Sequence, residues 1–377
     1  MSFEAVESAM DAAVGRCVFP GAVLLVREGT HVFYHRAFGN RSIEPEVSPM
    51  QEGTIFDLSS LTKPLATTLA VMMMIKDGKI DLDDRVTRFF HNFGVHGKTH
   101  ITFRHLLAHC SGLPAWRPYY KDILQHERRS GRINFLGSHD AKQFVYQQIH
   151  REKLDAPVGT KTIYSDLGFM MLGAVIEVVS GMTLDRYCHA RIFRPLQLRA
   201  TAFVDLSQLR ARHLEPVSDM IAPTERCPWR KRVLCGEVHD DNAHAMGGVS
   251  GHAGLFSSAK EIDTILCHLR DCYLDRGNKY LIPPKLMRRF WSREGSVPES
   301  TWCLGWDSPS PSGSLAGSHF PPSAVGHFGY TGTSIWVDHE RERHVILLSN
   351  RVHPTRNNDD IKEFRPHIHD LIAEALQ

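Results

Sequence analysis

Apolar residues recur along the chain in two patterns, and each pattern occupies its own regions. Apolar positions at helical spacing predict helices over residues 2–14, 60–75, 101–109, 141–154, 167–180, 183–193, 259–274 and about 359–376. Apolar or alternating runs bounded by turn residues predict strands at 22–26, 31–34, 302–306, 324–328, 332–337 and 344–349. The expected strands lie near both ends of the chain, and its middle carries helices.

This distribution predicts an α+β fold with two domains. Residues 1–65 and 240–377 are expected to form one discontinuous α/β domain, in which helices flank an antiparallel sheet. Residues 66–239 are expected to form an inserted all-α domain, with an active site in the cleft between the two. Residues 117–140 are polar and poorly patterned, which predicts an insertion, and residues 205–236 resemble a linker.

The most informative stretch is Asp57-Leu-Ser-Ser60-Leu-Thr-Lys63-Pro, which opens the helix expected over 60–75. A spacing of three residues puts Ser60 and Lys63 on one helical face, one turn apart. In the first turn, unpaired N–H groups and the helix dipole favour negative charge. A serine hydroxyl becomes a good nucleophile only when a neighbouring group takes its proton, and Lys63 is within reach. The pair is therefore a candidate catalytic site, although the triplet alone is common on helix surfaces.

Composition narrows the classes of function. The 377 residues are 42% hydrophobic and include 44 Lys and Arg against 42 Asp and Glu, a formal net charge of +2. Because no basic tract with interleaved aromatic residues occurs, we expect no nucleic-acid partner. The longest apolar stretch, residues 65–75, is too short to span a bilayer, so we expect no membrane partner. The N-terminus lacks a signal-peptide pattern, which predicts a cytoplasmic protein, and the oligomeric state stays open.

The sequence gives little support for a metal or cofactor. The eight cysteines form no C-x-x-C pair, which argues against a zinc ribbon or a redox dithiol. His239, Asp240, His244 and His252 surround a glycine-rich loop but lack ligand spacing with a third residue in register. We therefore expect no metal and no cofactor. The motif G-x-S-x-G is absent, so an α/β-hydrolase is not supported.

Three separated motifs occur in order: Ser60-x-x-Lys63, Tyr164-Ser165-Asp166 and His327-Phe328-Gly329. With them, the sequence resembles the serine β-lactamase and penicillin-binding-protein superfamily, specifically its class C-like branch. That branch includes class C β-lactamases, D-alanyl-D-alanine carboxypeptidases, D-aminopeptidases and β-lactamase-like carboxylesterases. Further segments extend the resemblance over nearly the whole chain, namely residues 19–22, 106–114, 164–173, 251–256 and 326–334. The resemblance implies a β-lactamase/transpeptidase-like fold.

The resemblance also implies roles for the motif residues. Ser60 would be the acylated nucleophile, Lys63 its partner in proton removal, and Tyr164 the second member of the proton relay. The backbone N–H groups of Ser60 and Tyr330 would form the oxyanion hole. Removing such a donor typically costs about 2–4 kcal/mol of transition-state stabilisation. The third motif, which ends at Gly329, would border the substrate.

Asp166 departs from the family pattern, because the second motif usually reads Tyr-x-Asn. An ionised Asp can only accept hydrogen bonds, and near Lys63 it would favour the ammonium form. The proton of Ser60 would then go to Tyr164. Alternatively, Asp166 would receive a cationic group of the substrate, such as a free amine. Asp is also a good N-cap, so it could begin the helix expected over 167–180.

His327 is the second departure, because it stands where the third motif of the family has Lys. Histidine is mostly neutral at pH 7, so the grip on a penicillin-type carboxylate should be weaker. Esters, amides without that carboxylate, or carboxylates bound by another cation are then favoured. Arg351, which follows the last expected strand, is the candidate for that other substrate-binding cation.

The sequence therefore predicts a serine hydrolase that acts through an acyl-enzyme on Ser60. Its expected substrates are small-molecule carboxylic esters, amides or peptides, with weak or no β-lactamase activity. One alternative is a D-amino-acid peptidase or muropeptide-processing hydrolase. The other alternative is a non-catalytic ligand sensor or scaffold that retains the fold.

Overall fold

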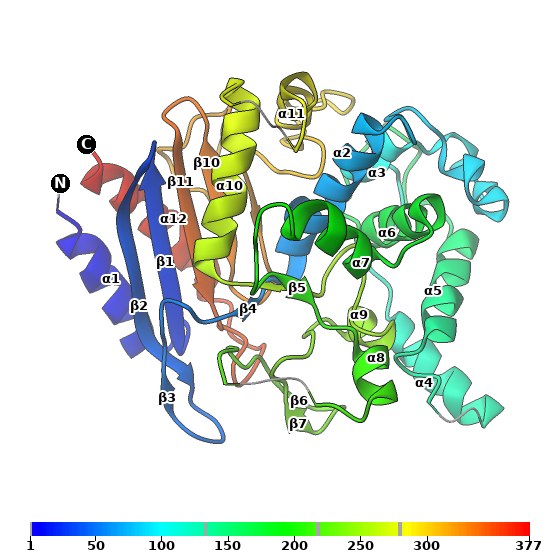
Figure 1. Ribbon diagram of the computed structural model, residues 1–377, viewed down its shortest axis with the longest axis horizontal. Coiled ribbons are helices and arrows are strands. Elements are labelled where there is room, and N and C mark those ends of the chain that lie inside the picture. The colour runs from blue at the N-terminus through cyan, green and yellow to red at the C-terminus, as the bar shows by residue number, and fades with distance from the viewer. Residues whose placement is uncertain (1, 132–133, 216–218, 278–280) are drawn as a thin grey trace.

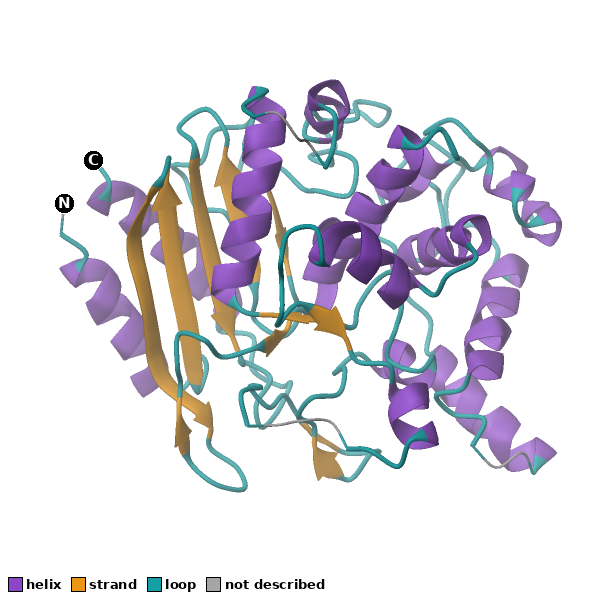
Figure 2. Cartoon of the chain, viewed as in Figure 1, coloured by secondary structure: helices purple, strands orange, loops and turns teal. Residues whose placement is uncertain are grey.

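A six-stranded antiparallel sheet is built from both ends of the chain (Figure 1; Figure 2). The structure is a computed structural model that describes residues 2–131, 134–215, 219–277 and 281–377. In the sheet order β3-β2-β1-β11-β10-β9, the strands are β1 (Gly21–Glu28), β2 (His31–Ser42), β3 (Ser48–Pro49), β9 (Val325–Phe328), β10 (Ser334–Asp338) and β11 (Arg343–Ser349). β1 pairs with β11 from Ala22 opposite Ser349 to Glu28 opposite Arg343, which joins the two ends of the chain.

Helices fill the segment between the two halves of the sheet, as the sequence predicts, and one further helix lies at each end of the chain. They are α1 (Glu4–Gly15), α2 (Leu69–Lys76), α3 (Phe103–Leu107), α4 (Tyr119–Ser130), α5 (His139–Arg151), α6 (Asp166–Ser180), α7 (Leu184–Cys188), α8 (Leu206–Ala211), α9 (Asp241–Ala245), α10 (Ala259–Leu274), α11 (Pro284–Phe290) and α12 (Ile361–Ala375). Shorter 3₁₀ or π segments are η1 (Ser59–Leu61), η2 (Lys63–Thr68), η3 (Val86–Arg88), η4 (His91–Gly94), η5 (Lys98–His100) and η6 (His189–Phe193). Small strands β4 (Phe56–Asp57), β8 (Leu255–Ser257) and β5 (Ala202–Phe203) form a second sheet, and β6 (Arg226–Cys227) pairs with β7 (Arg232–Val233).

Alternation along β1 separates two hydrophobic cores. Leu24 and Val26 belong to the core that includes α1 and α12, whereas Val23 and Leu25 belong to the core that includes α10 and the helical region. Successive strand side chains point to opposite faces, so both faces of the sheet are covered by helices. Figure 1 shows α1 and α12 on one side of the sheet and α10 on the other. The predicted antiparallel sheet flanked by helices is confirmed, and the domain boundaries stay a prediction.

One local prediction is wrong, and one helix lies in a stretch for which the sequence predicts no helix. Residues 302–306 form a loop rather than a strand, and its Cys303 N–H donates to the Trp306 carbonyl at 2.9 Å. Residues 117–140 include the regular helix α4, which buries only Tyr119 and Ile123 and so has a weak apolar pattern. Residues 132–133 of that stretch, and residues 216–218 of the expected linker, lie outside the described residues.

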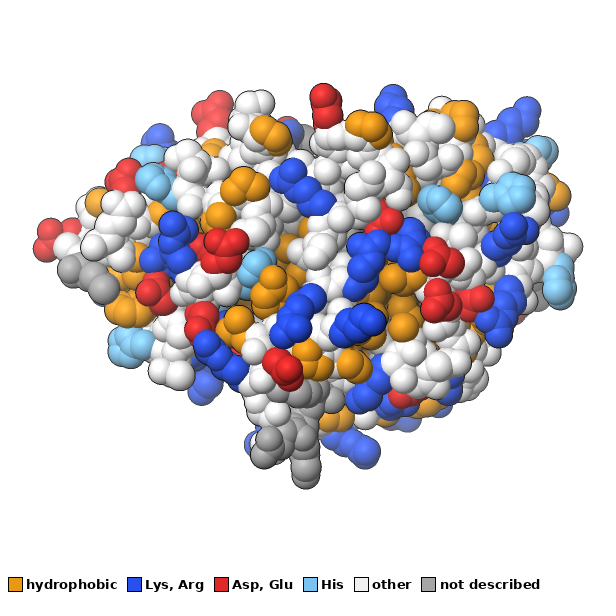
Figure 3. Space-filling model, turned by 90° about the horizontal axis from the view of Figure 1, so that it is seen from above, with side chains coloured by type: hydrophobic (Ala, Val, Ile, Leu, Met, Phe, Trp, Pro, Cys, Tyr) orange, Lys and Arg blue, Asp and Glu red, His pale blue; other side chains and the backbone are white. Residues whose placement is uncertain are grey.

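Among the described residues, no single helix is long and apolar enough to cross a membrane. The pair formed by α6 and the segment from α7 through η6 passes on combined length and composition, but the two parts are bent by 72°. Residues 167–176 of α6 are buried inside the protein. Figure 3 shows Lys and Arg interspersed with Asp and Glu on one face of the molecule.

Candidate active site

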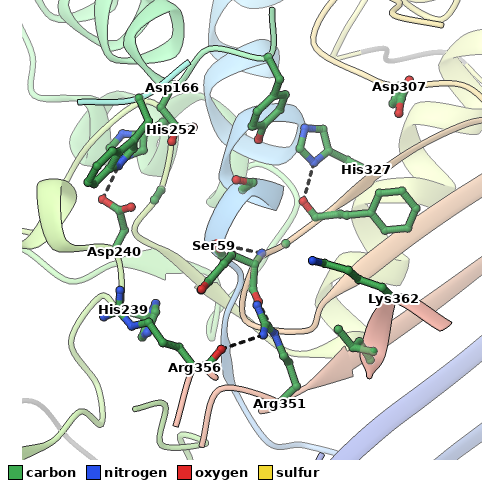
Figure 4. A pocket seen from close by; sticks show the side chains of 18 of the residues that line it. Ser59, Asp166, His239, Asp240, His252, Asp307, His327, Arg351, Arg356 and Lys362 are labelled. Carbon is green, nitrogen blue, oxygen red and sulfur yellow. Dashed lines mark hydrogen bonds and ion pairs between the residues drawn. The ribbon is translucent and has the colours of Figure 1, made fainter. Parts of the chain in front are cut away.

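A cleft of about 650 Å³ lies where segments from both ends and the middle of the chain meet (Figure 4). It is lined by Ser59, Ser60, Trp116, Tyr164, Asp166, His239, Asp240, Asp241, His252, Ala253, Trp302, Asp307, His327, Phe328, Gly329, Tyr330, Arg351, Arg356, Asp359, Ile361, Lys362 and Arg365. All three sequence motifs therefore contribute to one cleft.

Ser60 and Lys63 are in hydrogen-bond contact, as their spacing predicts. Lys63 Nζ lies 3.0 Å from Ser60 Oγ and also donates to the His252 carbonyl oxygen at 3.2 Å. The backbone here is not regular α-helix, because Ser60 lies in the 3₁₀ turn η1 and Lys63 begins the π-helical η2. Lys63 is completely buried, and a buried ammonium requires an anionic or strongly polar partner.

Asp166 supplies that partner from the first turn of α6. Its Oδ1 lies 2.7 Å from Lys63 Nζ. Burial alone lowers the pKa of Lys63, but the Asp166 carboxylate and the Tyr164 hydroxyl raise it above its ordinary value. Lys63 is therefore an ammonium at neutral pH. The predicted capping role of Asp166 is wrong, because Ser165 is the N-cap and its Oγ accepts from the Gly168 N–H.

Tyr164 lies against the same ammonium. The Nζ of Lys63 is 4.8 Å from the centre of the Tyr164 ring, which packs on His109 and Trp302 with centroid distances of 4.5 and 5.5 Å. Desolvation raises the pKa of Tyr164, and the Lys63 charge opposes that rise. The site thus holds a neutral phenol beside an ammonium, and the three predicted catalytic residues meet at one point.

His327 lies on β9, opposite Ile335 of β10, and carries no positive charge at neutral pH. Its Nδ1 lies 2.8 Å from the Phe328 carbonyl oxygen. A carbonyl can only accept, so Nδ1 carries the proton of the neutral ring. Burial and the Lys63 charge lower the pKa of His327 to about 3. The position of the family lysine is therefore uncharged, as its replacement by His predicts.

The turn between β9 and β10 brings the predicted oxyanion donor to the cleft. Gly329 N–H donates to the Thr333 carbonyl at 2.7 Å. A Cβ on Gly329 would lie 2.0 Å from Thr333 Oγ1 and 2.6 Å from the Leu58 carbonyl oxygen, so only glycine fits. The next N–H, that of Tyr330, donates to Ser59 Oγ at 3.2 Å. Ser59 thus contacts the group that is predicted to bind an oxyanion.

Sequence reasoning missed Ser59. Its φ of +49° lies in the left-handed region, which is uncommon for residues other than glycine. Its N–H donates to Asp57 Oδ1 at 2.8 Å, and the other oxygen of this carboxylate accepts the His239 N–H at 2.6 Å. The positive φ and the distant partner leave no pattern in the sequence beyond the position next to Ser60.

Arg351 borders the cleft as predicted, but its guanidinium binds backbone carbonyls. Its Nε donates to the Tyr330 oxygen at 2.8 Å, and its Nη1 donates to the carbonyl oxygens of Arg356 and Asn358. Nη1 is also 3.5 Å from Asp359 Oδ1. These contacts hold Arg351 in place from several sides, and its role as a substrate-binding cation stays a prediction.

Asp240 and His252 bind each other rather than forming an open ligand set. His252 Nε2 lies 2.9 Å from Asp240 Oδ1, and its Nδ1 lies 2.9 Å from Ser250 Oγ. Burial raises the pKa of Asp240, but His252 and the Ala243 N–H offset that effect and lower it below its usual range. Asp240 is therefore an ionised carboxylate at the cleft (Figure 4), a feature that sequence reasoning did not assign.

Within the described part of the chain, one group of side chains has spacing that could hold a metal ion. It consists of Asp263, Cys267 and His344 and does not line the cleft. Arg27 already binds both oxygens of Asp263, at 2.6 and 2.8 Å. The guanidinium therefore neutralises the only carboxylate of the group.

The chain is similar to known proteins over most of its length. It matches the Beta-lactamase family over residues 6–367. A putative D-alanyl-D-alanine carboxypeptidase of Escherichia coli (strain K12) is 30% identical over 357 residues, which cover 89% of this chain and 79% of the relative. An N-acetylmuramyl-L-alanine amidase of Bacillus subtilis (strain 168) is 31% identical over 364 residues, with coverage of 89% and 78%.

Solved structures show the same fold. EstCE1, described as a hydrolase with promiscuous acyltransferase activity, has a TM-score of 0.70 at 22% identity, covering 98% of this chain and 97% of its own. An octameric penicillin-binding protein homologue from Pyrococcus abyssi has a TM-score of 0.72 at 20% identity, with coverage of 100% and 77%. Because the family match spans nearly the whole chain, and curated relatives named as hydrolases cover most of it, this protein is a serine hydrolase that belongs to the beta-lactamase family.

Proposed function

We propose that this hydrolase acts through an acyl-enzyme on Ser60 and cleaves carboxylic esters or amides, with weak or no β-lactamase activity. The observation that carries the proposal is the contact of Ser60 Oγ with Lys63 Nζ at 3.0 Å in the cleft. Tyr164 beside this pair and the Tyr330 N–H, which contacts the neighbouring Ser59, supply the other groups that acyl transfer requires.

In acylation, Ser60 Oγ forms a bond to the carbonyl carbon of the substrate while the bond to the leaving oxygen or nitrogen breaks. The Ser60 proton passes to Tyr164 Oη as the proton of Tyr164 passes to the leaving group. Since Asp166 keeps Lys63 charged, the ammonium stabilises the negative charge that develops on Oγ and Oη. This favours the route through Tyr164 over neutral Lys63 as the base.

Deacylation repeats these steps with water. Water oxygen bonds to the acyl carbon, the carbon–Oγ bond breaks, and one water proton returns through Tyr164 to Ser60 Oγ. The N–H groups of Ser60 and Tyr330 stabilise the oxyanion in both half-reactions. Because Ser59 Oγ accepts from the Tyr330 N–H, the substrate carbonyl must replace that hydroxyl.

The uncharged His327 supports weak recognition of penicillins. A penicillin-type carboxylate would meet a neutral imidazole at the third motif, whose pKa of about 3 keeps it uncharged at neutral pH. The Arg351 guanidinium already donates hydrogen bonds to backbone carbonyls, so it is poorly placed to bind a substrate carboxylate in place of the family lysine. Esters and amides without this carboxylate avoid the mismatch.

A second candidate is a D-amino-acid peptidase or muropeptide-processing hydrolase. The relatives named D-alanyl-D-alanine carboxypeptidase and N-acetylmuramyl-L-alanine amidase favour it. The cleft of about 650 Å³ has room for more than a small acyl group, and the ionised Asp240 could bind an amine or hydroxyl of such a substrate. In this reading, Asp240 rather than Asp166 meets the substrate, because Asp166 is paired with Lys63.

Steady-state turnover of three substrates by wild type and Ser60→Ala separates these functions. We expect p-nitrophenyl butyrate to be hydrolysed with a kcat/KM at least about a hundredfold above that for benzylpenicillin, and Ser60→Ala to abolish turnover of both. A kcat/KM for an acyl-D-alanyl-D-alanine peptide above that for the ester would favour the second candidate. Efficient penicillin hydrolysis would contradict the proposal, and no turnover with any substrate class would favour the sensor.

A further inference from the structure

Two buried arginines bind the backbone of the β9–β10 turn. Arg365 of α12 donates from Nη2 to the carbonyl oxygens of Gly329 and Thr333, each at 2.8 Å. Arg351 donates from Nε to the Tyr330 oxygen at 2.8 Å. The exposed fractions of Arg365 and Arg351 are only 6% and 4%. The two guanidinium groups therefore bind the successive peptide groups that flank the Tyr330 Cα.

The peptide between Gly329 and Tyr330 has a different partner at each end. In a trans peptide the C=O and N–H point in opposite directions. Because Arg365 binds the carbonyl end, the N–H end points to the cleft wall, where it donates to Ser59 Oγ at 3.2 Å. A cationic donor on the carbonyl also polarises the peptide and makes its N–H a stronger donor.

The positive charge of Arg365 is buried, which is energetically unfavourable without an anionic partner. Within the described residues it forms no ion pair, and its guanidinium lies 4.9 Å from the centre of the Phe328 ring. Burial and the nearby Arg351 charge lower the pKa of Arg365, so the two carbonyl acceptors are its main stabilising contacts. An apolar side chain would fill the same space without this penalty. The positive charge of Arg365 is therefore better explained by its hydrogen bonds to the β9–β10 turn than by packing.

We propose that Arg365 is a positioning residue of this enzyme, which orients and polarises the Gly329–Tyr330 peptide so that the Tyr330 N–H stabilises the oxyanion. Arg351 fixes the following peptide through the Tyr330 carbonyl. The inference rests on the proposed function, because it requires acyl transfer at Ser60. It assigns a role in the transition state to a residue that lies in the final helix, 35 positions beyond Tyr330.

Arg365→Met and Arg365→Lys test the inference, with Arg270→Met as a matched control. Arg270 on α10 is also buried, with 5% exposed, and donates to the Gly29 carbonyl at 2.6 Å in a turn that does not line the cleft. For each variant we would measure kcat and KM for p-nitrophenyl butyrate and the Ki of a phenylboronic acid. The boronate adduct on Ser60 resembles the tetrahedral intermediate, so its affinity reports on the oxyanion hole.

Removing an oxyanion donor outright lowers kcat by about 10²- to 10³-fold, so misplacing one should cost less. We expect Arg365→Met to lower kcat about 10- to 100-fold with KM changed less than about threefold, and the boronate Ki to rise by the same factor as kcat/KM falls. Arg365→Lys keeps the charge but not the planar fork, so we expect a loss of about three- to tenfold. Arg270→Met should stay within about twofold of wild type.

A wild-type kcat in Arg365→Met, or a loss that appears only in KM, would overturn the inference and leave Ser60-dependent turnover, and so the proposed function, intact. If Arg365→Met does not fold, Arg365→Lys tests the inference instead, because an unchanged kcat in that variant would also overturn it. The absence of Ser60-dependent turnover in wild type would instead overturn the proposed function together with the inference.

Discussion

Asp166→Asn removes one charge from the buried pair that holds Lys63 as an ammonium. Coulomb's law with an effective dielectric constant of about 20 gives roughly 6 kcal/mol for unit charges at the observed 2.7 Å. Removing one partner of a buried pair typically destabilises a protein by about 3–5 kcal/mol. Without the Asp166 carboxylate, the pKa of Lys63 should therefore fall. Burial, which already favours the neutral amine, then acts without opposition from Asp166.

The pH dependence of this variant follows from the direction of the Lys63 shift. In wild type the pKa of Lys63 is raised above its unfolded value of 10.5, so the pair stabilises the fold below that pH and the effect is lost as pH rises through the folded pKa. At pH 7, Asp166→Asn should therefore have a lower Tm, and the deficit should shrink above about pH 10.5. Because the proposed mechanism uses the ammonium, the kcat/KM of the variant should begin to decline at a lower pH than that of wild type.

The assay is a pH profile of kcat/KM for p-nitrophenyl butyrate from pH 5 to 10, with Tm measured separately from pH 5 to about 12. Asp307→Asn is the control, because Asp307 also lines the cleft but accepts from Thr301 Oγ1 and the Ser308 N–H, at 2.6 and 2.9 Å. Asp307→Asn should leave the alkaline decline of kcat/KM at the same pH as in wild type. An unmoved limb in Asp166→Asn, or a gain in kcat/KM as Lys63 loses its proton, would refute proton transfer through Tyr164 with charged Lys63.

Three further substitutions have defined outcomes. His327→Lys restores the family cation, and a charge-assisted hydrogen bond is worth about 1.5–3 kcal/mol, so the rate of acylation by benzylpenicillin, measured by mass spectrometry, should rise about 10- to 100-fold. An unchanged rate would mean that the penicillin carboxylate does not reach β9. Ser59→Ala frees the Tyr330 N–H from its 3.2 Å contact and should raise ester kcat/KM about two- to tenfold in steady-state assays, whereas a loss would give Ser59 a catalytic role. Gly329→Ala places a Cβ 2.0 Å from Thr333 Oγ1 and should lower both Tm and kcat, whereas a wild-type melting curve would contradict the tight turn.

The sequence predicted the elements whose signals are local. The helix expected at 259–274 has the bounds of α10, because Ser258 caps it and its buried positions follow helical spacing. The strand expected at 302–306 was wrong because the apolar residues of this loop are buried without strand pairing. Leu304 and Trp306 are completely buried. Helix α4 was missed because it buries few apolar side chains.

The meeting of the motif residues at one cleft could also be predicted, but the residues that support them could not. Ser60 and Lys63 lie three positions apart, so local geometry brings their side chains together. Arg365 reaches Gly329 across 36 positions of sequence, and nothing in its neighbours tells that it binds carbonyls rather than a carboxylate or water. The contact of Ser59 with the Tyr330 N–H occurs in a residue with a positive φ, which the sequence around Ser59 does not predict. Such contacts are set by tertiary packing and become visible only in the fold.

The most direct test of the account is intact-protein mass spectrometry after incubation with a fluorophosphonate and with p-nitrophenyl butyrate, in wild type and Ser60→Ala. We expect one covalent adduct per wild-type chain, which peptide mapping places on Ser60, and none in Ser60→Ala. Ser59→Ala is the matched control, because it removes the adjacent hydroxyl and should still be labelled. An adduct that persists in Ser60→Ala, or that maps to another residue, would contradict the assignment of Ser60 as the nucleophile.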